Sequence, residues 1–394
     1  MSAAPLSSIT AQSPFQGAER PAPVKWIGGA AFDAMFFVFP TIFSVLYVGA
    51  FLVFGGNGMV HSALNAFLLC FAVFHTCGTF FFYFDRQNLA HYRRHYKIYF
   101  IGPAVVFLGG MGISITEYFA YMNPAVPRFD FTLAIAFIWV SYHVTRQNIG
   151  FAGFYRHKFG LFDHRERDID NHAIYANALL LYSMGWVFSD YPMFLSPVRE
   201  LGFWHWLLIP LVAYWVWAMV HMVVARARSL WASKFASWPH AAMVFTSLTF
   251  PLPLFFTVFS PEPNFLMFSH AQFGLVAHYT QYIAIVMLVH FHKYPAMMPS
   301  AHGGGEAPAG RAELIFGRLP FNGIWALFAF SLLFTGGLVG FFYFSASTGH
   351  QSLIAIATGM VIGSGFVHFY LDAYMWAMRE DFNRKALLPY LKPL

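Results

Sequence analysis

Charged residues are scarce in this chain, and their scarcity excludes most soluble folds. Only 10% of the 394 residues are Asp, Glu, Lys or Arg, whereas soluble domains carry about 25%. Hydrophobic residues make up 58% of the chain and aromatic residues 20%. The apolar runs are long and continuous rather than alternating, which argues against a transmembrane β-barrel. The composition therefore predicts an all-α, polytopic membrane protein.

Cysteine is almost absent, and no nucleic-acid-binding motif is present. Cys70 and Cys77 lie in one apolar segment, where we expect them to pack and not to form a disulfide. The formal net charge is +6. In a membrane protein such basic residues reflect topology, so we expect no nucleic-acid partner.

Ten apolar segments are long enough to cross a hydrocarbon layer, which takes about 20 residues. They cover residues 28–55, 61–84, 98–122, 131–155, 172–194, 203–225, 239–260, 264–291, 320–345 and 352–378. Residues 1–25 are rich in Ala, Ser and Pro and are expected to form a disordered tail. Residues 26–394 then form a single transmembrane helical domain, with a flexible cytoplasmic loop at 295–319.

Basic residues are distributed unevenly between the loops that join these segments. Twenty of the 23 Lys and Arg residues fall in the two tails and in alternate loops, while the other loops hold only Arg128 and Arg199. Cytoplasmic loops carry such an excess of Lys and Arg. The pattern predicts an even number of crossings, both termini in the cytoplasm, and a bacterial inner (plasma) membrane as the location.

Four histidines lie at similar depths in four segments that run from the outside inward. They are His75, His143, His278 and His368, each 12–16 residues from the outer end of its segment. This places them about 18–24 Å below the outer edge, at about 1.5 Å per residue. Ionisable side chains inside a bilayer are costly and mark functional sites. We therefore expect one polar layer in the cytoplasmic half of the membrane.

Polar side chains follow three of these histidines by about one helical turn, and so share their helix faces. These partners are Gln147 after His143, Gln281 and Tyr282 after His278, and Asp372 after His368. A histidine and a carboxylate one turn apart form a common pair of metal ligands in helical bundles. The predicted metal ligands are His75, His143, His278, His368 and Asp372, with His172 in reserve at the start of the next ascending segment.

The metal is expected to be iron, with zinc or copper as other options, because imidazole and carboxylate ligands suit these ions. Two alternatives stay open. Two of the histidines could be axial ligands of a haem, or the histidines could only join helices by hydrogen bonds.

Arg146 lies in the fourth segment, beside Gln147. It could extend to the cytoplasmic surface, pair with Asp372 or Asp33, or bind an anionic group of a substrate. The candidate catalytic residues are therefore Arg146, Gln147, Tyr282 and Asp372.

The predicted loop 84–97 contains His91 and His95 at HxxxH spacing. This five-residue motif resembles a histidine box that membrane fatty-acid desaturases and hydroxylases carry on their cytoplasmic side. The later HxxHH boxes of those families are missing, and the nearest candidate is His290-Phe291-His292. A basic interfacial helix that contacts lipid phosphates is the other interpretation.

Two further resemblances concern the segments themselves. Phe32-Asp33 and the later His-x-x-x-Gln, His-x-x-Gln-Tyr and His-x-x-x-Asp patterns resemble a group of bacterial, histidine-rich, multi-pass membrane proteins without an established activity. The joining of His and Asp also resembles the intramembrane zinc hydrolases of the ceramidase and adiponectin-receptor type. Those hydrolases have seven helices and a final HxxxH where this chain has His368-x-x-x-Asp372.

These observations lead to a metal-dependent membrane oxidoreductase, with non-haem iron, that acts on a hydrophobic or lipid-like substrate and needs an electron donor. A water-poor histidine and carboxylate site suits oxygen chemistry on apolar molecules. The alternatives are a zinc-dependent intramembrane hydrolase, a proton- or ion-coupled transporter that uses the same layer, and a purely structural subunit.

Overall fold

The protein is helical throughout the part of the chain that the computed structural model describes. That part comprises residues 26–54, 58–122, 131–160, 163–188, 204–233, 235–252, 263–294, 314–315, 323–378 and 380–392. Its β-structure is a single isolated bridge between Asp85 and Leu314. The tail predicted at 1–25, and all of the loop at 295–319 except Leu314 and Ile315, lie outside the described residues.

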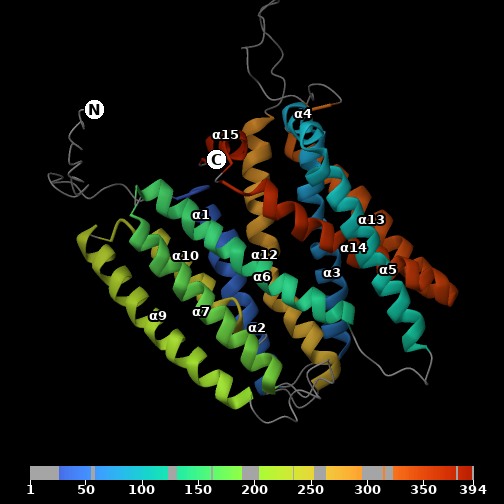
Figure 1. Ribbon diagram of the computed structural model, residues 1–394, viewed down its shortest axis with the longest axis horizontal. Coiled ribbons are helices and arrows are strands. Elements are labelled where there is room, and N and C mark those ends of the chain that lie inside the picture. Colours follow the sequence, from blue (N-terminus) through green and yellow to red (C-terminus); the bar gives the residue numbers. More distant parts are fainter. Residues whose placement is uncertain are drawn as a thin grey trace, which may run out of the picture.

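Long helices form most of the fold (Figure 1). The principal helices are α2 (Phe39–Phe54), α3 (Gly58–Phe81), α5 (Gly102–Tyr121), α6 (Phe131–Phe159), α7 (His164–Phe188), α9 (Trp204–Ala232), α10 (Trp238–Thr249), α12 (Pro263–Lys293), α13 (Gly323–Thr348) and α14 (Gln351–Met375). Short helices supplement them: α1 (Ala30–Asp33), α4 (Arg86–Arg94), α15 (Asp381–Leu387), the 3-10 turns η2 (Phe82–Phe84) and η5 (Leu388–Tyr390), and the π-helices η1 (Ala34–Val38) and η3 (Lys97–Ile101).

Every one of the ten predicted apolar segments overlaps one of the principal helices. Five of the described helical stretches are long and apolar enough to cross a membrane, namely Ala30–Tyr47, Lys97–Ala120, Leu208–Ala232, Gly323–Thr348 and Gln351–Met375. The all-α class is therefore confirmed. The count of ten crossings and the cytoplasmic position of the termini stay predictions, and α10, with 12 residues, is shorter than a crossing requires.

Local sequence explains several helix boundaries. Pro103 and Pro239 lie in the first turns of α5 and α10, where the missing N–H of proline costs nothing. Asp85 begins α4 by accepting a hydrogen bond from the backbone N–H of Asn88 at 2.8 Å, as expected of an N-cap residue. Gly349, with φ of +69°, makes the tight turn between α13 and α14, and glycine adopts this conformation without strain.

The helices α3, α6, α12 and α14 surround the interior of the molecule. Helix α3 packs against α12, α13 and α14, and α14 also contacts α5 and α6. Glycines allow the close approach of α5 and α14, because a Cβ atom at Gly363 would lie 2.9 Å from the carbonyl oxygen of Phe107. Small residues serve the same purpose at other membrane helix interfaces.

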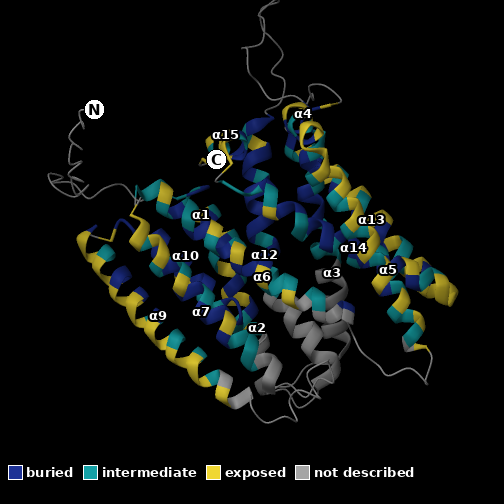
Figure 2. Ribbon diagram, viewed as in Figure 1, coloured by how far each residue is buried: buried dark blue, intermediate teal, exposed yellow. Residues whose placement is uncertain are grey.

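Burial is concentrated in the centre, and large apolar side chains are exposed on the outer helices (Figure 2). Leu332 and Leu333 on α13 and Trp206 on α9 are more than 70% exposed. An exposed apolar surface of this extent suits a lipid environment. Several polar side chains within the helices are, by contrast, at most 2% exposed, among them His75, His278, Gln281 and His368.

Candidate metal centre

His75, His143, His278 and His368 meet in the interior, each contributed by a different helix: α3, α6, α12 and α14. The ring centroids of His75 and His368 are 4.2 Å apart, and those of His75 and His278 are 4.7 Å apart. His143 lies 5.0 Å from both His278 and His368. One nitrogen from each ring can be chosen so that all four lie within 4.8 Å of one another. The group could therefore hold a metal ion.

The nitrogens of these rings are the strongest sign of a ligand. Within the described residues, Nε2 of His75, His143 and His368 and both ring nitrogens of His278 are buried and have no hydrogen-bond partner. Nearly all buried polar atoms in proteins are paired, and an unpaired one costs about 1–3 kcal/mol. Four such rings in contact need an explanation, and coordination of a shared cation would pair one nitrogen of each ring.

Two of the histidines have their other nitrogen engaged. Nδ1 of His75 lies 3.1 Å from the carbonyl oxygen of Ala72, so it must carry the proton, and Nε2 keeps its lone pair. Nδ1 of His368 lies 2.7 Å from the hydroxyl oxygen of Thr79. Metal-binding histidines commonly have such a bond on the nitrogen that does not face the metal.

Asp372 lies beside the four rings and is held by hydroxyl groups. Thr79 donates to its Oδ1 at 2.8 Å, and Tyr282 donates to the same oxygen at 2.9 Å. Trp376 donates from Nε1 to the Tyr282 hydroxyl at 3.3 Å. Because the Thr79 hydroxyl is used as a donor to Asp372, its oxygen accepts from Nδ1 of His368. This assignment leaves Nε2 of His368 free to bind a cation.

Thr79 and Trp376 were not among the residues predicted from the sequence. Thr79 follows His75 by four residues, so each of the four histidines has a polar residue at this spacing on its own helix. The same spacing as that of Gln147, Tyr282 and Asp372 is the signal that could have indicated Thr79. Trp376 lies beyond the end of α14, where no helical periodicity indicates its direction.

The two glutamines lie beside the site but bond to backbone. Gln147 donates from Nε2 to the carbonyl oxygen of His278 at 3.1 Å, which joins α6 to α12. Gln281 is fully buried and donates to the carbonyl oxygen of Phe37 at 3.2 Å, which joins α12 to η1. These two bonds thus hold in place the helices that carry His143 and His278.

Arg146 and His172 lie apart from the four histidines. The exposed Arg146 donates to the Tyr175 hydroxyl at 3.0 Å. The pairing considered with Asp33 is not formed, because Asp33 accepts from the backbone N–H groups of Ile27 and Gly28 instead. Neither does Arg146 pair with Asp372, whose bonds are described above. The exposed His172 lies 2.7 Å from the Tyr214 hydroxyl, since its face of α7 turns toward α9.

The HxxxH pair lies on α4, outside the group of four. His91 and His95 have ring centroids 4.5 Å apart, and His91 stacks on Phe382 of α15 at 3.8 Å. Partial burial, and then the neighbouring His95 and Arg94, lower the pKa of His91. The pair therefore packs α4 against α15, and its rings belong to no cluster of three or more potential ligands in the described part of the chain.

Haem does not fit this geometry. Two axial ligands must lie on opposite faces of a flat macrocycle, but the four rings contact one another at centroid distances of 4.2–5.0 Å. The space between them suits a single ion. No protein family, curated protein or solved structure matches this chain, so its function has to be inferred from the site itself.

Proposed function

We propose that the protein is a metal-dependent membrane oxidoreductase whose metal, iron in the first instance, is held by His75, His143, His278 and His368. The observation that carries this proposal is the convergence of buried imidazole nitrogens without partners from four different helices. A shared depth in the sequence suggested such a layer, and the ring contacts supply the proximity that coordination requires.

The number of imidazoles favours iron over catalytic zinc. Catalytic zinc sites have three protein ligands and keep the fourth position for water or substrate. Four histidines fill a tetrahedral zinc site completely, whereas iron accepts further ligands. Bound iron would supply one-electron chemistry with O₂. The proposed substrate is hydrophobic or lipid-like, because the site is enclosed by helices with apolar outer faces, and an electron donor completes the reaction.

The surrounding residues have separate tasks. Asp372 supplies the negative charge that a divalent cation needs in a water-poor interior. It is also the candidate fifth ligand. Thr79 and Tyr282 fix the direction of its carboxylate, and Thr79 also fixes the ring of His368. Tyr282 is the polar side chain best placed to give a proton to a reacting oxygen, since its hydroxyl already lies in this network. Gln147 keeps α6 and α12 in register.

The test is the metal content of the purified protein and of four single variants: His75→Ala, His143→Ala, His278→Ala and His368→Ala. We expect stoichiometric iron in the wild type and its loss from each variant. His172→Ala is the matched control, because it removes an exposed histidine of a neighbouring helix and should keep the metal.

Each outcome has a definite meaning. Iron with an absorbance change on addition of O₂ supports the oxidoreductase. Stoichiometric zinc without such a change, retained by one of the four variants, would replace it with the hydrolase, in which three histidines and a water would bind zinc and Asp372 would act as the general base. Wild-type protein that contains no iron, copper or zinc would exclude both, and proton flux in liposomes that is abolished by Asp372→Asn would then indicate a transporter.

A further inference from the structure

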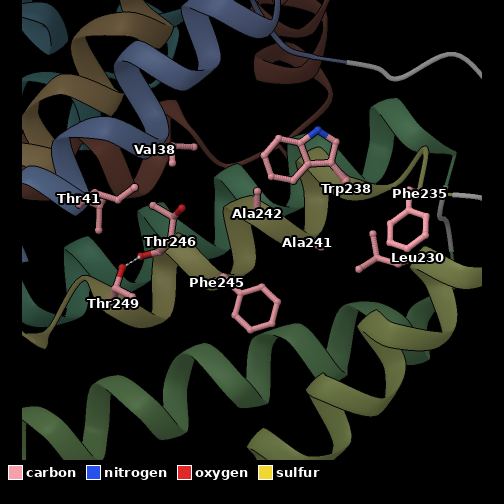
Figure 3. Close-up of a pocket in the computed structure, with 11 residues that line it drawn as sticks. Val38, Thr41, Leu230, Phe235, Trp238, Ala241, Ala242, Phe245, Thr246 and Thr249 are labelled. Atoms are coloured by element: carbon pink, nitrogen blue, oxygen red, sulfur yellow. Dashed lines mark hydrogen bonds between the residues drawn. The ribbon is translucent and has the colours of Figure 1, made fainter.

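An apolar groove lies on the surface between α2, α9 and α10 (Figure 3). Its volume is about 570 Å³, and its lining includes Val38, Ile42, Leu230, Phe235, Trp238 and Phe245. Three threonines, Thr41, Thr246 and Thr249, gather at one end, while Trp238, Phe235 and Leu230 lie at the other. The groove thus has an apolar length and one end with hydroxyl groups.

Thr41 is the unusual member of this lining. Its side chain is 2% exposed, and its hydroxyl has no hydrogen-bond partner within the described residues. A threonine inside a helix usually bonds to the carbonyl four residues earlier, as Ser44 does to Pro40 at 2.7 Å. For Thr41 that carbonyl belongs to Phe37, which lies in the π-helix η1 and accepts from Gln281 instead. π-helical turns of this kind are frequent at functional sites.

The hydroxyl end of the groove lies close to the metal centre. The bond from Gln281 to Phe37 fixes the alignment of α12 with η1 and α2, which run in opposite directions (Figure 1). One turn further along α2 from Phe37 is Thr41, and one turn back along α12 from Gln281 is His278. Phe250 directly follows Thr249 and meets the ring of His278 edge-on, with centroids 6.5 Å apart. Phe250 thus joins the hydroxyl end of the groove, through its chain neighbour Thr249, to the ring of His278.

We propose that this groove binds the apolar chain of the substrate, a neutral lipid-like molecule taken from the bilayer, and that Thr41 donates a hydrogen bond to an oxygen of that molecule. The assignment of this ligand as the substrate rests on the proposed oxidoreductase function. The groove is open to the lipid-facing side, since Phe245 and Ile42 are nearly half exposed, so a bilayer molecule reaches it without crossing water.

A second groove provides a matched control. It lies between η1, α2 and α12, has a volume of about 580 Å³ and is also apolar. Its one threonine, Thr280, donates to the carbonyl oxygens of Val276 and Ala277 and has no need of a ligand. If only apolar volume mattered, both grooves would bind a lipid-like probe equally well.

The experiment is photolabelling of the metal-loaded protein in nanodiscs with two probes, a sixteen-carbon alcohol and the corresponding alkane, each carrying a diazirine. Labelled peptides are located by mass spectrometry. We expect the alcohol to label residues 230–249 to a much greater extent than the residues that line the second groove. Ala242→Phe should abolish this labelling, and Ala34→Phe, which fills the second groove, should leave it unchanged. Thr41→Val should weaken labelling by the alcohol about fivefold, the value of one hydrogen bond, without affecting the alkane.

The proposal is overturned if both grooves label equally, or if Thr41→Val affects neither probe or both alike. Metal content is measured on the same samples. If labelling fails in a protein with full metal content, the groove is excluded as the substrate site, and the proposed oxidoreductase function is unaffected. Selective labelling of a protein that binds no metal would support the groove as a lipid site and would contradict the proposed oxidoreductase function.

Discussion

One carboxylate oxygen of Asp372, Oδ2, lies 3.8 Å from Nε2 of His143. The separation is too long for a hydrogen bond, although both groups are buried and Asp372 holds its other oxygen against Thr79 and Tyr282. A cation bound by His143 would place its charge next to this carboxylate. Asp372 is therefore the counter-charge of the proposed centre, whether or not it becomes a ligand.

Asp372→Asn keeps the shape of the side chain and removes its charge. We expect metal affinity to fall about 10–100-fold, the usual effect of losing an outer partner of a metal site. Competition with a chelator of known affinity measures the change. Asp168→Asn, at an exposed aspartate paired with Arg167, is the control and should have wild-type affinity. Equal affinities in all three proteins would contradict the role given to Asp372.

Thr79→Val should disturb the same centre by a different route. The variant is nearly isosteric but removes the donor to Asp372 and the acceptor for Nδ1 of His368. Since the ring of His368 then loses its fixed orientation, we expect weaker metal binding and an altered absorption spectrum of the bound metal. Thr116→Val, whose hydroxyl bonds only within its own helix, should show neither effect. An unchanged spectrum in Thr79→Val would refute the network.

Removal of the metal should destabilise the fold. A ligand that binds only the folded state adds about 4 kcal/mol at a concentration a thousandfold above its dissociation constant. We therefore expect a chelator to lower the melting temperature of the wild type in detergent, and re-addition of iron to restore it. His278→Ala, which lacks one proposed ligand, should melt at the same temperature with and without chelator. A wild type that is indifferent to chelation would argue against a bound metal.

His91→Ala distinguishes the two histidine sets. If the centre resembled that of a desaturase, loss of His91 would release the metal. Because His91 instead stacks on Phe382, we expect full metal content and a loosened contact between α4 and α15, visible as faster hydrogen exchange in 381–387. Release of metal from this variant would show that His91 and His95 take part in metal binding.

Asp170→Ala should destabilise the protein without touching the metal. The carboxylate is fully buried and pairs with His240 at 3.0 Å and with Arg226 at 3.3 Å. Breaking a buried pair leaves an uncompensated charge and costs about 3–5 kcal/mol. Denaturation in mixed micelles, together with metal analysis, measures both quantities. If the variant lost its metal at unchanged stability, Asp170, Arg226 and His240 would belong to the metal centre.

The sequence was sufficient to indicate which histidines meet, because depth along a crossing segment depends only on where the segment starts and which way it runs. His75, His143, His278 and His368 satisfied that condition and lie together. Rotation about the helix axis was harder to judge. Arg146 follows His143 by three residues but reaches Tyr175, and His172 faces α9. Which helices flank a given face is a property of the packed bundle, and a single sequence does not contain it.

The sequence alone did not indicate the importance of Thr79 and Phe250, for a different reason. Threonine and phenylalanine are ordinary residues in an apolar segment, so neither stands out by its cost of burial. Their importance comes from what they contact: Thr79 bonds to a histidine and an aspartate of another helix, and Phe250 meets the ring of His278 edge-on. Contacts between helices distant in the chain appear only when the bundle is assembled.

The origin of the four histidines on α3, α6, α12 and α14 also sets an order of events during biosynthesis. His368 lies on the last of the long helices, so a nascent chain presents at most three of the imidazoles until α14 has been inserted and has packed against α3 and α6. A metal ion held by all four histidines would then be loaded only after α14 has packed. A ribosome that stalls before residue 351 would leave a product that lacks His368 and therefore the complete group of four histidines.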